Sequence, residues 1–439
     1  MMTVAPAPHV RWAGLVVTAA SLATIAFVTL LPDRGQVVGS HLCLVCGDLG
    51  SVNAVLNVLL FVPLGIGLAL SGLSGKRVLL VVCVLSALIE AAQLFLIPGR
   101  DATIGDVVAN TIGGALGFAI AGYAHRWLRP PPRLATNLAI GWAAIWLAIQ
   151  AVSNFTFAPS LPDTQYYGQI ARVFWNRAVF PGLVVTATID DVRIPNTALT
   201  NSHRVRALIL EGATVATTVV PAESTRDVAP IVRLVDGEKN EMVLLAQNGE
   251  SLVLGVRTGS AVLRLRPLLF ALPAAFPADN STSLPIDTLR LSGRYTARNA
   301  QLNATRTSAI RGRGIPIAAS LGWTSWLPFQ WFIEGTRSEL LVSWIWLACL
   351  AMPLGYWSAR ISAHLPSRES VRHWAPVVFA GVALLCIGLV VMPIAFGLLP
   401  ASLDDWLATL AGLLVAGRIG ALTTQAQREQ PGDIAPPKG

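Results

Sequence analysis

The chain has 439 residues, is 54% hydrophobic and only 13% charged, and carries a formal net charge of +8. This composition is too apolar for a soluble protein, and the length exceeds one ordinary domain. The positive charge does not indicate nucleic-acid binding, because much of it falls in short loops flanking apolar segments, where it sets membrane orientation. No cofactor is expected, and five cysteines are too few for a disulfide scaffold.

Apolar segments long enough to cross a bilayer, about 20 residues each, recur along the chain. The expected spans are residues 12–31, 52–73, 78–97, 103–124, 134–153, 339–358, 374–396 and 401–420. No small-residue cleavage site follows Leu31, so the first span is interpreted as an uncleaved helix.

The distribution of basic residues predicts the orientation of these spans. The N-terminal side collects Arg11, Lys76, Arg77, Arg126, Arg129, Arg133, Arg360, Arg368, Arg372, Arg418, Arg428 and Lys438, whereas the short loops on the other side hold only Arg34 and Arg100. Cytoplasmic loops are the basic ones in membrane proteins. We therefore expect a bacterial plasma-membrane protein with both termini in the cytoplasm and residues 154–338 outside.

The short loop after the first span contains a cysteine pair, Cys43 and Cys46, preceded by His41. Zinc takes four ligands and no second cysteine pair exists, so a metal site would need further donors. A local disulfide is the favoured interpretation in an oxidising compartment, ahead of free thiols and of metal.

Polar side chains recur at one level of spans two, three and four. Ionisable groups cost about 2.5–3.5 kcal/mol at the bilayer centre, so those that remain tend to mark function. Glu90 and Gln93 are three residues apart, and Asp106 and Asn110 are four apart, so each pair shares a helix face. A rise of about 1.5 Å per residue places the set roughly 5–10 Å below the outer surface. One polar pocket is predicted, lined by Asn57, Glu90, Gln93, Arg100, Asp101, Asp106 and Asn110.

A purely structural interpretation of these residues competes with this pocket. Asp106 could be a helix N-terminal acid, Asn57 and Asn110 could be interhelical hydrogen-bond partners, and Arg100 could pair with Asp101 or Glu90. Glu90 fits that interpretation least well, because a carboxylate at such a depth must be paired, protonated or wetted.

Between residues 154 and 318 the long apolar runs give way to short alternating ones, which predict an extracytoplasmic antiparallel β-sandwich. Asn248-Gly249 and Asp236-Gly237 are turn signals, the first for a hairpin. The strand pattern resembles concanavalin A-like, laminin G-type sandwiches. That resemblance implies a glycan partner, with a packing module as the alternative. Residues 319–338 are rich in tryptophan and phenylalanine and predict an interfacial membrane anchor.

Two segments predict an internal repeat. NVLLFVPLGIG at residues 57–67 matches LACLAMPLGYW at 347–357, and GDVVANTIGG at 105–114 matches DDWLATLAGL at 404–413. The alignment pairs Asp106 with Asp405 and Gly113 with Gly412, which indicates a degenerate four-plus-four arrangement. The second half lacks the polar set, since Leu347 stands for Asn57 and Thr409 for Asn110. A chance match is the alternative.

The segment NVLLFVPLG, the Glu90–Gln93 pair and the series from Arg100 to Gly113 together resemble the VanZ-like family of bacterial membrane proteins, over about residues 12–125. This resemblance implies a cell-envelope protein whose founding relatives are accessories in resistance to glycopeptide antibiotics, notably teicoplanin. No catalytic role can be assigned to any residue from this resemblance. The matching positions are Asn57, Pro63, Gly65, Glu90, Gln93, Arg100, Asp106, Asn110 and Gly113.

The predicted fold class is a polytopic α-helical membrane protein of about eight spans with an extracytoplasmic sandwich. Its expected parts are a VanZ-like four-helix domain at 1–130, a fifth helix at 131–153, the sandwich at 154–318, the aromatic segment at 319–338, C-terminal helices at 339–420 and a disordered cytoplasmic tail at 421–439. Membrane lipid is an expected partner. A non-enzymatic binder of a lipid-linked or amphiphilic glycan is favoured over an intramembrane enzyme with Glu90 or Asp106 as acid or base, and over a transporter.

Overall fold

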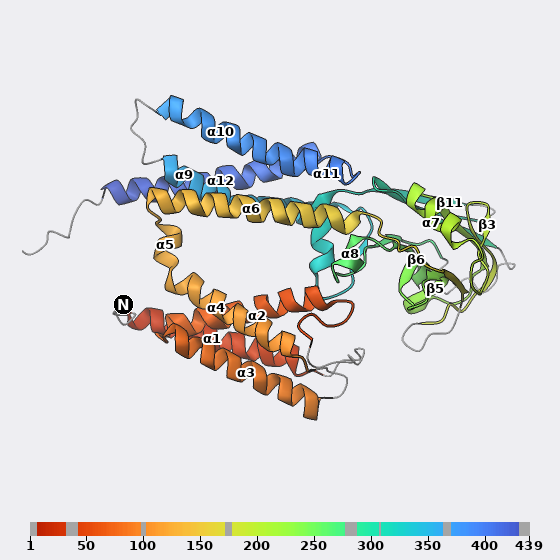
Figure 1. The fold of residues 1–439 in the computed structure, drawn as a ribbon, viewed down its shortest axis with the longest axis horizontal. Coiled ribbons are helices and arrows are strands. Elements are labelled where there is room, and N and C mark those ends of the chain that lie inside the picture. The colour runs from red at the N-terminus through yellow and green to blue at the C-terminus, as the bar shows by residue number, and fades with distance from the viewer. Residues whose placement is uncertain are drawn as a thin grey trace, which may run out of the picture. The chain divides into compact units, whose positions relative to one another are not determined.

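The computed structural model describes residues 7–31, 43–97, 102–171, 178–276, 288–306, 309–362 and 370–429 (Figure 1). Within these residues, eight helices are long and apolar enough to cross a membrane. Two sheets, antiparallel but for one strand pair, form a separate region, so the prediction of a polytopic helical protein with a β-sandwich is confirmed. The chain divides into two compact units, Met1–Ala135 and Thr136–Gly439.

The first unit is a bundle of four membrane-length helices followed by a short one. They are α1 (Pro8–Thr29), α2 (Gly50–Leu70), α3 (Gly75–Leu96), α4 (Ile104–Gly122) and α5 (Ala124–Leu128). The helices α2 and α4 lie backbone to backbone, because a Cβ atom on Gly65 would collide with the carbonyl oxygen of Gly114, and one on Gly113 with that of Val58. Glycine on a helix face permits such close approach.

The last helix of the second unit departs from its expected boundary. The helices are α6 (Pro132–Phe157), α9 (Arg337–Ser362), α10 (Ser370–Cys386), a π-helical turn (Ile387–Val391), α11 (Met392–Ala395) and α12 (Leu403–Glu429). Because α12 continues to Glu429, the prediction of a disordered tail from residue 421 is wrong for residues 421–429. Residues 430–439 lie outside the described part of the chain.

The predicted repeat has a geometric counterpart in the helix pair α9 and α12. A Cβ atom on Gly355 would collide with the carbonyl oxygen of Leu413, and one on Gly412 with that of Ala348. The sequence alignment pairs these four positions with Gly65, Gly114, Gly113 and Val58, the residues that make the α2–α4 contact. The same two backbone contacts therefore set both helix crossings.

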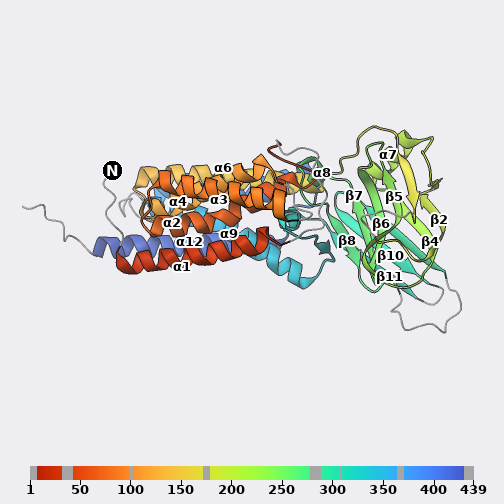
Figure 2. The ribbon, with the colours of Figure 1, turned by 90° about the horizontal axis from the view of Figure 1, so that it is seen from below.

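The sandwich consists of two six-stranded sheets whose apolar faces pack together (Figure 2). One sheet has the order β1-β5-β6-β7-β8-β12 and the other β11-β10-β9-β4-β2-β3. The strands are β1 (Tyr167–Ile170), β2 (Leu183–Ile189), β3 (Val192–Arg193), β4 (Thr214–Val220), β5 (Thr225–Val235), β6 (Glu241–Gly249), β7 (Ser251–Val256), β8 (Leu269–Leu272), β9 (Leu289–Tyr295), β10 (Asn299–Thr305), β11 (Ile310–Pro316) and β12 (Phe332–Ile333). The connections include α7 (Ser202–Glu211), α8 (Gly259–Val262) and a 3-10 helix (Ala319–Trp326).

The hairpin between β6 and β7 turns one residue later than the sequence predicts. Asn248 pairs with Ser251, so Gly249 and Glu250 are the two central residues of the turn. Gly249 takes a positive φ of 60°, which glycine adopts without a steric cost. The Asp236-Gly237 turn between β5 and β6 forms as expected, and the Asp236 carboxylate accepts the backbone N–H of Asn240 at 2.8 Å.

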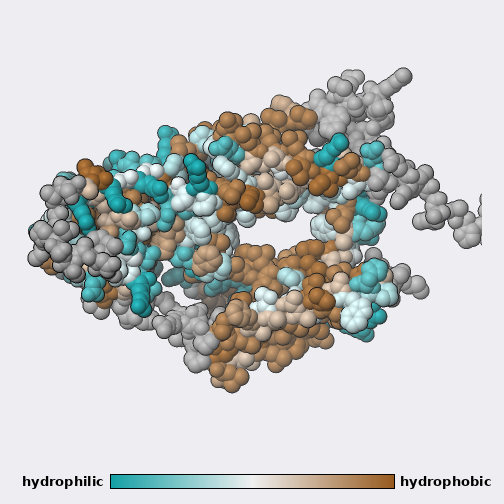
Figure 3. Space-filling view, turned by 180° about the vertical axis from the view of Figure 1, so that it is seen from behind, coloured by the Kyte–Doolittle hydropathy of each residue, from teal (hydrophilic) through white to brown (hydrophobic). Residues whose placement is uncertain are grey.

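The aromatic segment, which we expect to be an interfacial anchor, makes buried contacts with α9. Trp323 is buried, and its indole N–H donates to Ser343 Oγ of α9 at 2.9 Å. The Trp331 indole packs against it with ring centroids 5.5 Å apart and donates to the buried Glu339 carboxylate at 3.0 Å. Phe329 is 53% exposed. The segment thus joins the sandwich to α9 through buried contacts. Figure 3 shows apolar surface over the helices and polar surface over the sandwich.

Candidate functional site

The candidate site lies where α3 ends and where α2 and α4 begin. The helix α4 starts at Ile104 because Thr103 caps it: the Thr103 hydroxyl accepts the backbone N–H of Asp106 at 3.1 Å. Threonine three residues before an acid is a common helix-start pattern. This cap brings the Asp106 carboxylate to the first turn of α4, level with the last turns of α3.

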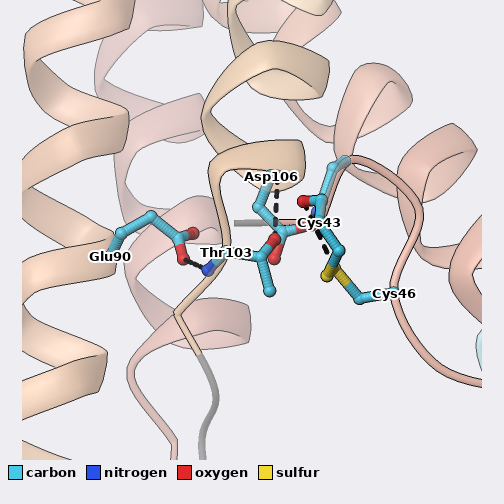
Figure 4. Close-up of a disulfide and its surroundings, with 6 residues drawn as sticks. Cys43, Cys46, Glu90, Thr103 and Asp106 are labelled. Atoms are coloured by element: carbon cyan, nitrogen blue, oxygen red, sulfur yellow. Dashed lines mark hydrogen bonds between the residues drawn. A yellow bond between two sulfur atoms is a disulfide. The ribbon is translucent and has the colours of Figure 1, made fainter. Parts of the chain in front are cut away.

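Two carboxylates meet at this cap from different helices. The Glu90 carboxylate of α3 accepts the backbone N–H of Thr103 at 2.8 Å. The Asp106 carboxylate accepts the side-chain amide N–H of Asn57, on α2, at 2.5 Å. Glu90 is 8% exposed, so it does not point into lipid. Figure 4 shows the side chains of Glu90 and Asp106 on either side of Thr103.

The corresponding helix start in the second repeat satisfies its hydrogen bonds locally. Asp405 closes a capping box there, since its carboxylate accepts the backbone N–H of Ser402 at 3.0 Å while the Ser402 hydroxyl accepts the Asp405 N–H at 3.2 Å. In the first repeat the Glu90 carboxylate accepts the backbone N–H of Thr103, whereas the Asp106 carboxylate accepts the side-chain N–H of Asn57. The polar network between α2, α3 and α4 therefore replaces an ordinary capping box.

A second layer of polar groups lies one turn deeper. The Asn110 side-chain amide donates to Ser86 Oγ of α3 at 2.8 Å, and both side chains are buried. The Oδ1 atom of Asn110 has no hydrogen-bond partner among the described residues. A buried carbonyl oxygen without a donor costs free energy unless water or a ligand supplies one. The site thus presents an acceptor that the described part of the chain does not satisfy.

Gln93 differs from the expectation of a residue in the shared pocket. Its side-chain amide donates to the backbone carbonyl of Thr29, at the end of α1, at 2.9 Å. Gln93 therefore ties α3 to α1 and does not join the hydrogen-bonded set of Asn57, Glu90 and Asp106.

The loop before α2 packs on the N-terminus of α4 and is closed by a Cys43–Cys46 disulfide, as the favoured interpretation predicted (Figure 4). The carbonyl oxygen of Cys43 accepts the backbone N–H of Gly105 at 3.2 Å. A Cβ atom at Gly105 would collide with the carbonyl oxygen of Leu44, so only glycine lets the loop approach this closely.

Three residues named from the sequence, His41, Arg100 and Asp101, lie outside the described residues. Sequence reasoning missed Thr103 and Ser86. The Thr-x-x-Asp spacing at 103–106 carried a signal for the first, and the four-residue spacing of Ser86 and Glu90 on α3 carried one for the second.

The site is a set of hydrogen-bond acceptors at one end of a helical bundle. Carboxylate and amide oxygens from α3 and α4 suit a partner rich in hydroxyl or ammonium donors. Among the described residues, no group of three or more His, Cys, Asp or Glu side chains is arranged to hold a metal ion.

The geometry defines a polytopic membrane protein whose N-terminal unit carries buried polar groups near one end of its helices. A family model described as VanZ/LLP1 matches residues 4–125, so the N-terminal unit is similar to that family, and the eight apolar helices make the chain a membrane protein. No curated protein and no solved structure matches the chain. The concanavalin A-like type of the sandwich stays a prediction.

Proposed function

We propose that the VanZ-like domain binds the polar part of a lipid-linked or amphiphilic glycan and that the sandwich holds its saccharide portion. The observation that carries this proposal is the hydrogen-bonding pattern at the start of α4. Glu90 satisfies the Thr103 N–H in place of Asp106, and Asn110 keeps a buried oxygen without a donor among the described residues. Acceptors arranged in this way suit the hydroxyl groups of a sugar or a polar lipid headgroup.

The proposed orientation places this site near the outer leaflet. The basic residues Lys76 and Arg77 begin α3, whereas Glu90 lies near its other end. The positive-inside rule assigns the basic end to the cytoplasm, with the N-terminus and C-terminus on that side and the sandwich outside. On this orientation the helical site and the sandwich are both on the outer side of the membrane.

The test is mass spectrometry of lipids and glycans that co-purify with the full-length protein, comparing two matched variants. Asn110→Thr installs the residue of the second repeat and removes the unsatisfied oxygen. Thr409→Val changes the equivalent position of the second repeat, where the hydroxyl donates to the carbonyl oxygen of Asp405 in the same helix at 2.8 Å. We expect a glycan-bearing amphiphile in the wild type and in Thr409→Val, and its depletion in Asn110→Thr. Equal retention in both variants would refute the assignment of the site.

The second candidate is an intramembrane enzyme acting on a lipid-borne substrate, favoured by the two carboxylates beside Thr103. Glu90→Gln separates the two functions, because glutamine keeps an oxygen that accepts the Thr103 N–H but cannot act as a general base. A binding protein then retains the co-purifying ligand at a level near that of the wild type. An enzyme instead accumulates unreacted substrate. A transporter is distinguished by uptake of the same ligand into sealed vesicles.

If the ligand is a cell-wall precursor, a role in teicoplanin-type glycopeptide resistance follows from the proposal. Expression of the wild type and of Asn110→Thr in a susceptible host tests this role, with drug susceptibility as the readout. Protection by the wild type alone would support it, and identical susceptibility would remove it.

A further inference from the structure

The three-stranded meander β9-β10-β11 is strongly basic. Its described residues, 288–306 and 309–316, contain Arg290, Arg294, Arg298, Arg306, Arg311 and Arg313, and they contain no lysine, aspartate or glutamate. Arginine binds carboxylate and phosphate groups through two parallel N–H donors, which lysine cannot do. A concentration of one charge on one part of a domain attracts ligands of the opposite charge.

Two of these arginines lie on the outward face of their sheet. Along β9, Leu289, Leu291 and Tyr295 are buried against the other sheet, whereas Arg290 and Arg294 are exposed. Strand geometry places the Cα atoms of residues four apart about 13 Å from each other. Arg290 and Arg294 therefore project from the same face of the sheet, where the Nε atom of Arg294 donates to the carbonyl oxygen of Gly212 at 2.6 Å.

The register of the sheet places several neutral polar groups beside these arginines. Across β10 and β9, Asn303 pairs with Ser292 and Gln301 with Arg294. Across β4 and β2, Thr218 pairs with Thr186 and Ala216 with Thr188. The outward residues of the six strands also include Arg193, Thr214, Asn299, Thr305, Gly312 and Gly314, with the apolar Leu183, Val220 and Ile310 towards the strand ends. None of these strand residues is acidic, and the nearby Asp190 carboxylate, before β3, accepts the backbone N–H of Thr214 at 2.8 Å.

Gly312 permits the amide of Asn303 to lie over β11, because a Cβ atom there would collide with Asn303 Oδ1. A row of amide and hydroxyl groups thus runs between the two arginines. Amides and hydroxyls both donate and accept hydrogen bonds, as sugar hydroxyls require. We call the outward side chains of β2, β3, β4, β9, β10 and β11 the arginine–amide face.

We propose that the arginine–amide face binds an acidic polysaccharide chain, with Arg290 and Arg294 holding its anionic groups and the amides and hydroxyls between them bonding its sugar hydroxyls. This proposal rests on the proposed function, of which it names the saccharide class and the surface. Among the described residues, no outward side chain of β4, β9 or β10 is aromatic, so base stacking by a single-stranded nucleic acid has no platform there.

The test measures binding of octagalacturonate, a carboxylate-bearing oligosaccharide, to the full-length protein in neutral phosphatidylcholine nanodiscs. The variant Arg290→Gln/Arg294→Gln removes two charges from the arginine–amide face. The matched control Arg226→Gln/Lys239→Gln removes two charges from exposed positions at β5 and the β5–β6 turn, on the other sheet. Thermal unfolding of all samples verifies that both variants fold.

We expect the wild type and the control to bind octagalacturonate, with affinity that falls as salt is raised, and the Arg290/Arg294 variant to bind at least about tenfold more weakly. Methyl-esterified octagalacturonate, which is uncharged, should bind at least about tenfold more weakly to the wild type. Equal losses in both double variants would indicate general charge attraction and overturn the proposal. So would equal binding of the methyl ester, or arginine-dependent binding of phosphatidylglycerol vesicles without binding of octagalacturonate.

Failure of this proposal is distinguishable from failure of the proposed function. The co-purifying amphiphile depends on Asn110 in the VanZ-like domain, so its retention is measured in the same samples. Loss of octagalacturonate binding with the amphiphile retained tests the arginine–amide face alone. Absence of any co-purifying amphiphile from the wild type contradicts the helical site instead.

Discussion

The side-chain amide of Asn57 donates to the Asp106 carboxylate at 2.5 Å and so joins α2 to α4. The aligned residues of the second repeat, Leu347 and Asp405, make no such pair, because Asp405 accepts the backbone N–H of Ser402 within its own helix start. The helix pairs α2–α4 and α9–α12 thus share the same glycine contacts but differ in the donor to one carboxylate, which is on another helix for Asp106 and at the same helix start for Asp405.

A double-mutant cycle with Asn57→Ala and Asp106→Ala measures this interhelical bond. We expect a coupling free energy of about 0.6–1.7 kcal/mol, the range found for hydrogen bonds between membrane helices. Asn57→Ala alone should cost more than the coupling, because it removes one donor from a partly buried carboxylate. The free energy of unfolding in detergent is the measurement, and additive single effects would contradict the bond.

Alanine at Gly113 should destabilise the bundle, because its Cβ atom would collide with the carbonyl oxygen of Val58 on α2. Overpacking of this kind costs about 1–3 kcal/mol. Gly122→Ala is the control, since the nearest atoms there, on the Phe118 ring, are 3.7 Å away. A thermal unfolding midpoint that shifts equally in both variants would argue against the α2–α4 contact.

Reduction of the Cys43–Cys46 disulfide should loosen the start of α4. The disulfide closes the loop whose Cys43 carbonyl accepts the Gly105 N–H, so a freed loop exposes that amide. Amide hydrogen exchange at Gly105 and Asp106 should accelerate in Cys43→Ser/Cys46→Ser. The control is Cys83→Ser/Cys349→Ser, which alters two free cysteines on α3 and α9. Unchanged exchange at Gly105 would show that the disulfide does not hold this helix start.

The sandwich should lose stability at alkaline pH through two buried tyrosines. Burial raises the pKa of Tyr166 to about 12, and burial also raises the pKa of Tyr295 above its usual range. The unfolded chain releases these protons near pH 10, before the folded chain does. The contribution of these protonated tyrosines to the free energy of unfolding is therefore complete below about pH 10. It is lost as the pH rises towards 12 and beyond.

Tyr295→Phe tests both the loss of stability at alkaline pH and the hydrogen bond that the Tyr295 hydroxyl makes. The Tyr295 hydroxyl donates to the backbone carbonyl of Phe157, at the end of α6, at 2.6 Å. Its removal should cost about 1–3 kcal/mol at neutral pH, since a buried carbonyl is left unsatisfied. It should also flatten the alkaline loss, which unfolding curves at a series of pH values would record. Tyr167→Phe, at a 38% exposed position, is the control.

Much of the helical site was predictable because helix periodicity fixes which residues share a face. The shared face of Asp106 and Asn110 follows from spacing alone, and the common level of Glu90 and Asp106 follows from span boundaries. The direction of Gln93 did not follow, because it depends on where α1 ends relative to α3. The hydrogen bond from the Thr103 N–H to Glu90 likewise could not be predicted, because it depends on the distance between α3 and α4. The residue spacing within one helix does not determine that distance.

In the sandwich, the alternation of apolar residues predicted strands, but the register depended on local turn geometry. The Asn248-Gly249 signal placed the turn one residue early, because Gly249 supplies the positive φ as the first central residue and Glu250 completes the turn. The buried contacts of the aromatic segment did not follow from the sequence for a different reason. Tryptophans near a membrane end suit an interface, but Ser343 and Glu339 of α9 offered buried acceptors for Trp323 and Trp331.

The glycine contacts shared by α2–α4 and α9–α12 have a further consequence. A helix crossing held by main chain against glycine does not depend on the side chains at the helix ends. Polar groups can therefore be gained or lost there while the scaffold stays in place, as Leu347 and Thr409 illustrate. The packing of these helices is therefore independent of their polar residues. The polar residues of α2 and α4 could be introduced by substitution into α9 and α12.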